Sequence, residues 1–220
     1  DDMNKNGVAS LITDLMMEGT ATKTPQELQE EIEMLGANIN MYTTRESIVV
    51  QVNTLVRNYE ATLALVEEIL TQPRWDKEEF ERIKTAAINR VKRSSANPNA
   101  VAGRVFNKLL YGEDHIFAYP NTGTVTSIAA IAMEDVKAFY DKNFSPSVSK
   151  FHIVGQIDKT KAMAGLVNLE KNWASKQVTI PSYPIANSRD KSSLYFVDIP
   201  GAKQSVIQIG NISLARSDTD

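Results

Sequence analysis

The segment spanning residues 7–20 most constrains what this chain can fold into. Its apolar residues recur at intervals of three and four, the spacing of one helix face; they are Val8, Leu11, Ile12, Leu15 and Met16. Gly19 ends the helix, since glycine readily takes the left-handed conformation found after helix C-termini. The remaining polar positions, Ser10, Thr13 and Asp14, predict a partly exposed stripe. We therefore predict a helix over residues 7–18, around which the rest of the chain is organised.

The sequence then predicts a second helix, followed from residue 37 by a change to the period of strands. Thr24-Pro25-Gln26-Glu27 predicts a second helix start, because a threonine cap, a proline in the first turn and a glutamate three residues on form a capping box. Alternating β-branched residues at 37–44 and 46–55 predict an antiparallel hairpin. Helices are predicted from apolar spacing at 58–72, 77–94, 100–110, 133–143 and 158–173, and a strand at 149–156.

The predicted helices and strands do not alternate strictly along the chain. This order predicts an α+β fold, with an antiparallel sheet and helices packed on one face. We predict one domain over residues 1–180 and a linker rich in proline and serine over 181–192. Strands are predicted at 194–199 and 205–214, within a tail of residues 193–220. So few strands cannot form a core alone. The tail therefore either opens a second domain or docks as a ribbon on the first sheet.

Composition excludes several classes of function. A net charge of −3 over 220 residues gives no global reason to expect nucleic acid as a partner. The basic residues of 82–93 follow glutamates on the same helix, which is typical of a solvated face. No apolar run approaches the roughly 20 residues of a membrane span. The chain has no cysteine, which excludes disulfides and thiolate sites, and its two histidines are His115 and His152.

Four further stretches carry a resemblance to a known family. They are residues 19–37 with Gly-Thr, Thr-Pro-Gln-Glu-Leu and Leu-Gly-Ala, residues 70–75 with Leu-Thr-Gln-Pro-Arg-Trp, residues 109–120 with Leu-Leu-Tyr-Gly, His115 and Pro120, and residues 139–158 with Phe-Tyr, Asn-Phe and Val-Gly-Gln-Ile-Asp. In order and spacing the chain resembles the pitrilysin/insulinase family of zinc metallopeptidases. It is similar also to mitochondrial processing peptidase-like proteins. The resemblance implies a pitrilysin-like domain lacking its first strands, with residues 193–220 as the opening strands of the next homologous domain.

In that family the first helix carries an inverted His-x-x-Glu-His zinc motif. Here those positions read Ser10, Thr13 and Asp14, and Arg90 falls near the distant glutamate ligand. A hydroxyl and a carboxylate are poor substitutes for two imidazoles, and an arginine repels a cation. The resemblance therefore implies a degenerate site, with no metal, cofactor or catalytic residue in this chain and zinc in a partner half. A weak oxygen-ligand site is the alternative.

Other candidate sites have simpler interpretations. His115 is interpreted as a solvated loop residue, although it can bind a metal adventitiously, and His152 as lying on the less buried face of a strand. The neighbouring carboxylates Glu78 and Glu79 point in different directions on a helix, so they do not converge. Ser10 lacks a visible base that would make it a nucleophile. No glycine-rich phosphate loop is present.

These observations predict a structural and substrate-enclosing half of a zinc peptidase, inactive alone. Its partner would be a homologous catalytic half, on the same polypeptide or another chain, and residues 48–52 are a candidate sheet edge for the peptide substrate. A non-proteolytic scaffold subunit is the alternative, and an active enzyme with an unrecognised site is a third possibility. The tail would pair with the sheet at the position of the missing first strands, either within the chain or across a homodimer.

The first residues suggest processing. Asp1-Asp2 replaces an initiator methionine, so we expect an internal or processed piece, from which an export signal can have been removed. The compartment is left unknown, with the bacterial periplasm or envelope suspected from the habit of the family.

Overall fold

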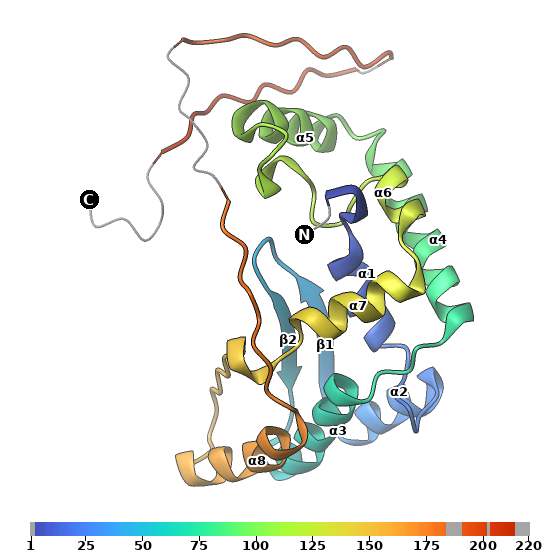
Figure 1. Cartoon of the computed structure of the whole chain (residues 1–220), viewed down its shortest axis with the longest axis vertical. Coiled ribbons are helices and arrows are strands. Elements are labelled where there is room, and N and C mark those ends of the chain that lie inside the picture. The colour runs from blue at the N-terminus through green and yellow to red at the C-terminus, as the bar shows by residue number, and fades with distance from the viewer. Residues whose placement is uncertain (1–2, 184–190, 202, 214–220) are drawn as a thin grey trace.

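The computed structural model describes residues 3–183, 191–201 and 203–213 (Figure 1). Its α-helices are α1 (Val8–Met16), α2 (Pro25–Met34), α3 (Tyr59–Thr71), α4 (Lys77–Ser94), α5 (Pro98–Tyr111), α6 (Val125–Ala130), α7 (Met133–Asn143) and α8 (Lys159–Asn172). The strands are β1 (Asn38–Thr43) and β2 (Ile48–Asn53), and short 3-10 helices are η1 (Met3–Lys5), η2 (Val56–Asn58), η3 (Ile116–Ala118) and η4 (Pro146–Val148). The fold is α+β and rich in helices, which lie to one side of a small antiparallel sheet.

The predicted hairpin is confirmed. β1 and β2 pair antiparallel, with Ile39 opposite Val52 and Met41 opposite Val50. Burial alternates along β1, since Ile39 and Met41 are buried while Asn38 and Asn40 are exposed. This period of two turns one face of the hairpin toward the helices.

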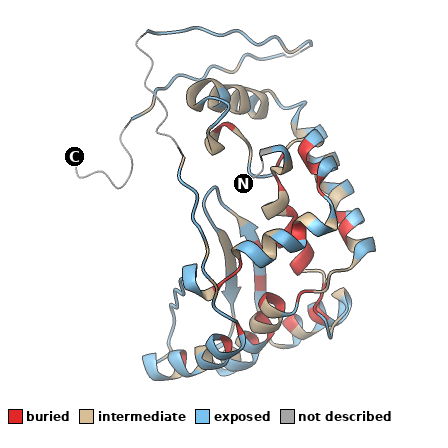
Figure 2. Ribbon diagram, viewed as in Figure 1, coloured by how far each residue is buried: buried red, intermediate tan, exposed pale blue. Residues whose placement is uncertain are grey.

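Helix α1 lies at the centre of the core, as its apolar spacing predicted. Leu11, Ile12, Leu15 and Met16 are each at most 1% exposed. They pack between α4, α7 and β1, where Figure 2 shows the buried residues gathered. Each such side chain contributes about 1.5–3 kcal/mol of burial free energy. Helix α1 thus supplies contacts to both the sheet and the helical layer.

The helix starts follow the predicted chemistry. At α2, the Thr24 hydroxyl accepts from the Glu27 N–H, and the Glu27 carboxylate accepts from the Thr24 N–H, so the capping box is complete. Asn97-Pro98, predicted only to close the preceding helix, also begins α5, because the Asn97 side chain caps the Asn99 N–H. Helix α6 was not predicted, since its six residues are too few to show a period.

The predicted strand at 149–156 is not formed. This segment has no assigned strand, and Phe151, Ile153 and Val154 are exposed. The sequence pattern gives the propensity, but a strand exists only where a neighbour accepts and donates its backbone hydrogen bonds. In the described part of the chain β2 is bonded to β1 alone, so residues 149–156 are not paired with the sheet.

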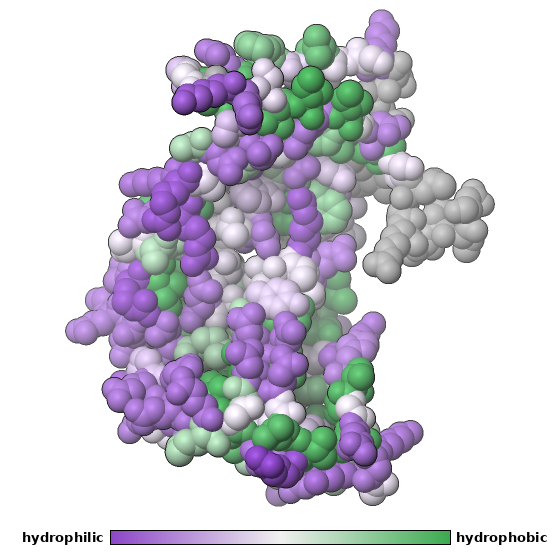
Figure 3. All heavy atoms as spheres, turned by 180° about the vertical axis from the view of Figure 1, so that it is seen from behind, coloured by the Kyte–Doolittle hydropathy of each residue, from purple (hydrophilic) through white to green (hydrophobic). Residues whose placement is uncertain are grey.

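The two strands predicted in the tail are not formed in its described part either. Residues 194–199 and the described part of 205–214, which ends at 213, carry no assigned strand. Gln208 and Gly210 lie against α5, beside Gly103 and Phe106 respectively. Several apolar side chains remain exposed at this end of the molecule, where Figure 3 shows apolar residues gathered; they include Leu194, Phe196, Ile207 and Ile209. Most of the predicted linker lies outside the described residues, and the division at residues 181–192 stays a prediction.

A search of the described helices for one long and apolar enough to cross a bilayer finds none.

Candidate site between helices α1 and α4

The polar face of α1 is less exposed than predicted. Ser10 and Asp14, one turn apart, are partly exposed, but Thr13 is buried at 2% exposure. The Thr13 hydroxyl donates to the Ser10 carbonyl at 2.9 Å, which satisfies it inside the helix. The expectation of a polar stripe is therefore wrong at Thr13, because a backbone hydrogen bond lets this hydroxyl be buried.

Helix α4 brings Arg90 to the same place. Its Nη1 lies 3.9 Å from Oδ2 of Asp14, so the two positions indicated by the family resemblance do meet across the helix pair. Burial raises the pKa of Asp14, the Arg90 guanidinium lowers it and Glu18 raises it again, and the net direction is upward. Because the Arg90 side chain is 58% exposed, this pair contributes at most about 1 kcal/mol.

Two pockets flank Arg90. The first has a volume of about 210 Å³ and is lined by Ser10, Leu11, Ala87, Arg90, Val91, Ser94 and Thr122. The second has a volume of about 280 Å³ and reaches β1; it is lined by Thr13, Asp14, Met17, Glu18, Asn40, Met41, Arg82, Ile83, Ala86 and Arg90. Arg90 therefore lines both pockets, which we together call the groove because residues of α1 and α4 contribute to each.

A second arginine of α4 is fully paired. Arg82 bonds Glu18 of α1 at 2.6 Å and Glu79 of its own helix at 2.6 Å. Hydrogen bonds with Glu79 and Glu18 raise the pKa of Arg82. Glu79 is thus occupied with an arginine, which agrees with the interpretation that Glu78 and Glu79 do not act as a catalytic pair.

The residues of this groove do not fit a zinc ion. A catalytic zinc takes three protein ligands and a water. Ser10, Asp14 and Arg90 supply one neutral hydroxyl, one carboxylate and one cation. Across residues 3–183, 191–201 and 203–213, no group of three or more histidine, aspartate or glutamate side chains is placed to hold a metal. That the chain binds no zinc stays a prediction.

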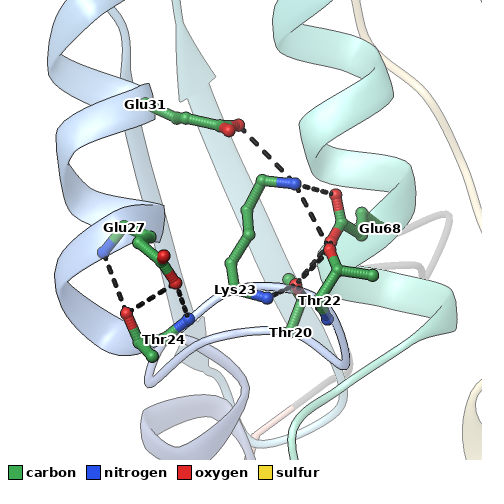
Figure 4. Close-up of polar contacts among 7 residues, drawn as sticks. All are labelled: Thr20, Thr22, Lys23, Thr24, Glu27, Glu31 and Glu68. Atoms are coloured by element: carbon green, nitrogen blue, oxygen red, sulfur yellow. Dashed lines mark hydrogen bonds and ion pairs between the residues drawn. The ribbon is translucent and has the colours of Figure 1, made fainter.

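A polar cluster beyond α1 holds the helix in place (Figure 4). Gly19 has φ of +106°, and a Cβ there would lie 2.5 Å from the Lys23 carbonyl oxygen, so the turn requires glycine. The turn brings Thr20, Thr22 and Lys23 onto one carboxylate of α3, Glu68, to which all three donate; the Lys23 Nζ lies 2.6 Å from it. This cluster fastens the end of α1 to α3.

Replacing Glu68 with glutamine is expected to lower the free energy of unfolding by about 1–3 kcal/mol near neutral pH, because the negative charge is lost and an amide nitrogen replaces the oxygen that accepts from Lys23. Burial alone would raise the pKa of Glu68, but the bonds from Lys23, Thr20 and Thr22 lower it below 4.5. Its contribution is therefore full above pH 4.5 and is lost as the pH falls through the folded value. Urea unfolding of both proteins from pH 3 to 7 measures this difference.

The matched control is Glu60→Gln, an exposed carboxylate at the start of the same helix. It should change stability by no more than about 0.5 kcal/mol. A gap between wild type and Glu68→Gln that widens at low pH would contradict the assigned role of the carboxylate.

The histidines lie elsewhere. His115 is half-buried, not solvated as predicted, and its Nδ1 accepts from the Phe117 N–H at 3.1 Å. Its ring stacks on Tyr111 with centroids 5.1 Å apart. Sequence reasoning missed Arg45 at the hairpin tip, whose Nη1 donates to the Phe117 carbonyl at 2.9 Å. His152 is exposed on the unpaired segment, since the strand that would have placed it on a sheet face does not form.

A sequence comparison matches residues 1–116, more than half of the chain, to the family described as Insulinase (Peptidase family M16). The chain belongs to this family. The M16 domain is 23% identical over 217 residues to an uncharacterized zinc protease of Streptomyces coelicolor, covering 97% of this chain and 47% of that protein. It is 24% identical to the beta subunit of mitochondrial-processing peptidase from Saccharomyces cerevisiae, covering 73% of this chain and 35% of that protein.

Solved structures give the same family and fold. The peptidase M16 inactive domain from Pseudomonas fluorescens superposes with a TM-score of 0.78 at 25% identity, covering 86% of this chain and 46% of that one. The first half of the periplasmic protease PqqL from Escherichia coli superposes with a TM-score of 0.74 at 20% identity, which shows the fold; 86% of this chain and 42% of that one are covered. The M16 domain thus spans less than half the length of each of these proteins.

Proposed function

We propose that this M16 domain is a zinc-free half of a peptidase chamber, which encloses a peptide that a homologous, zinc-bearing half cleaves. The observation that carries this proposal is the Arg90–Asp14 pair, because a cation and its counter-ion lie where the family resemblance places metal ligands. Relatives named zinc proteases, each more than twice as long as the region matched, and a structural neighbour named an inactive domain support it.

The sheet offers the peptide an edge. Hydrogen-bonded pairs alternate along an antiparallel ladder. At the turn the Thr44 N–H donates to the Ser47 carbonyl at 2.8 Å, so the alternation leaves the backbone groups of Ile48, Val50 and Val52 facing away from β1. No further strand pairs with β2 in the part of the chain that the structure describes. An extended peptide can bind there as an added strand.

A labelled, unfolded peptide tests this role. We expect fluorescence anisotropy to show that the purified chain binds the peptide but does not cleave it, with or without added zinc. The same peptide methylated on alternate backbone nitrogens should bind at least about tenfold more weakly, since main-chain hydrogen bonds are lost. Equal binding of both peptides would exclude strand addition, and cleavage by the chain alone would overturn the zinc-free assignment.

A further inference from the structure

The smaller pocket beside Arg90 has an unusual lining. Its seven residues include no carboxylate, and their polar groups are one guanidinium and the three hydroxyls of Ser10, Ser94 and Thr122. The Ser94 hydroxyl donates to the Val91 carbonyl at 2.8 Å. Within the described residues, the hydroxyls of Ser10 and Thr122 have no hydrogen-bond partner. The pocket lining therefore combines a cation and two such hydroxyls with apolar side chains.

The guanidinium of Arg90 has donors to spare. Its ion pair with Asp14 is 3.9 Å long, beyond hydrogen-bond distance, whereas Arg82 on the same helix holds two carboxylates at 2.6 Å each. Asp14 lines the other pocket. An incoming carboxylate would therefore meet a cation that makes no hydrogen bond to the described residues and whose counter-ion lies 3.9 Å away.

The volume and the lining residues of this pocket restrict which ligand can bind in it. About 210 Å³ is below the range of about 300–1,000 Å³ typical of small-molecule sites, so the pocket suits one side chain or chain end. Leu11, Ala87 and Val91 provide apolar surface for methylene groups. A planar guanidinium favours carboxylates because it can donate two parallel hydrogen bonds to them.

We propose that this pocket binds a carboxylate of the enclosed peptide, either from an aspartate or glutamate side chain or from its C-terminus. The inference rests on the proposed function, since it assumes that the chain binds peptides. It makes Arg90 a specificity-determining residue. Arg90, whose positive charge would repel a zinc ion, thus binds a negatively charged group of the peptide.

Four labelled peptides of one sequence test it, carrying glutamate or glutamine at one position and ending in a free carboxylate or an amide. Fluorescence anisotropy with the wild-type chain should show about tenfold weaker binding when the recognised carboxylate is neutralised. A preference for glutamate identifies a side-chain carboxylate, and a preference for the free end identifies the C-terminus. The preference should shrink at high salt, because the charges are partly exposed.

Arg90→Gln should abolish the preference, whereas Arg93→Gln, an exposed arginine three residues along α4 and outside the pocket, should keep it. Peptide binding without any preference for a carboxylate, or a preference that survives Arg90→Gln, would overturn this inference and leave the proposed function standing. Failure of every peptide to bind would overturn both. The comparison of peptides on the wild-type chain decides the question even if a variant fails to fold.

Discussion

Replacing Leu11 with aspartate is expected to unfold the domain. Leu11 is 1% exposed and lies in the core with α4 and β1 around its helix, so the variant must bury a carboxylate without a partner or give up the packing of α1. Either cost amounts to several kcal/mol, comparable with the whole stability of about 5–15 kcal/mol of a typical domain. Circular dichroism and urea unfolding should show lost helix content and no cooperative transition.

The adjacent position provides the control. Ser10→Ala changes the neighbouring residue of the same helix, whose hydroxyl has no partner among the described residues, and it should leave the unfolding midpoint nearly unchanged. A Leu11→Asp protein that unfolds cooperatively at the wild-type midpoint would show that α1 does not hold the core together.

Zinc binding should appear when the groove receives the ligands of the family. The wild-type chain is expected to retain no zinc after dialysis. Ser10→His combined with Asp14→His and Arg90→Glu should retain roughly one zinc per chain, since two imidazoles one turn apart and a carboxylate from α4 then converge. Thr13 is left unchanged, because its hydroxyl is buried and bonded within the helix. Atomic absorption of the dialysed proteins measures the metal content.

The double variant Ser10→His/Asp14→His separates metal binding at this site from adventitious binding by the new histidines. It keeps Arg90, so it should hold zinc far more weakly than the triple variant. Zinc retained by the wild-type chain would contradict the predicted degenerate site. A folded triple variant without zinc would show that positions 10, 14 and 90 are not the ligand positions.

The sequence predicted those features that local chemistry determines. The apolar spacing of α1, the capping box at Thr24 and the alternation of β1 each depend on residues close in the chain, and the structure confirms all three. The family resemblance indicated that Arg90 falls near the position of the distant glutamate ligand, and in the structure its guanidinium lies 3.9 Å from Asp14. Spacing alone would not have paired residues 76 positions apart.

The predictions that were wrong concern features that depend on partners elsewhere in the structure, which the sequence does not reveal. The segment at 149–156 has strand propensity, yet a strand needs a neighbour to share its hydrogen bonds. Thr13 was expected at the surface because it is polar, but one bond to its own helix allows burial. His115 was interpreted from its polar neighbours in the loop, whereas aromatic rings from α5 and η3 surround it.

The Arg90–Asp14 pair also limits which variants of this sequence can be reached one step at a time. Asp14→His alone removes the counter-ion of Arg90 and leaves the guanidinium beside the new imidazole, whereas Arg90→Glu alone places two carboxylates together. Only combined changes remove the conflict. We therefore expect that no single substitution at position 14 or 90 creates a zinc site in this groove.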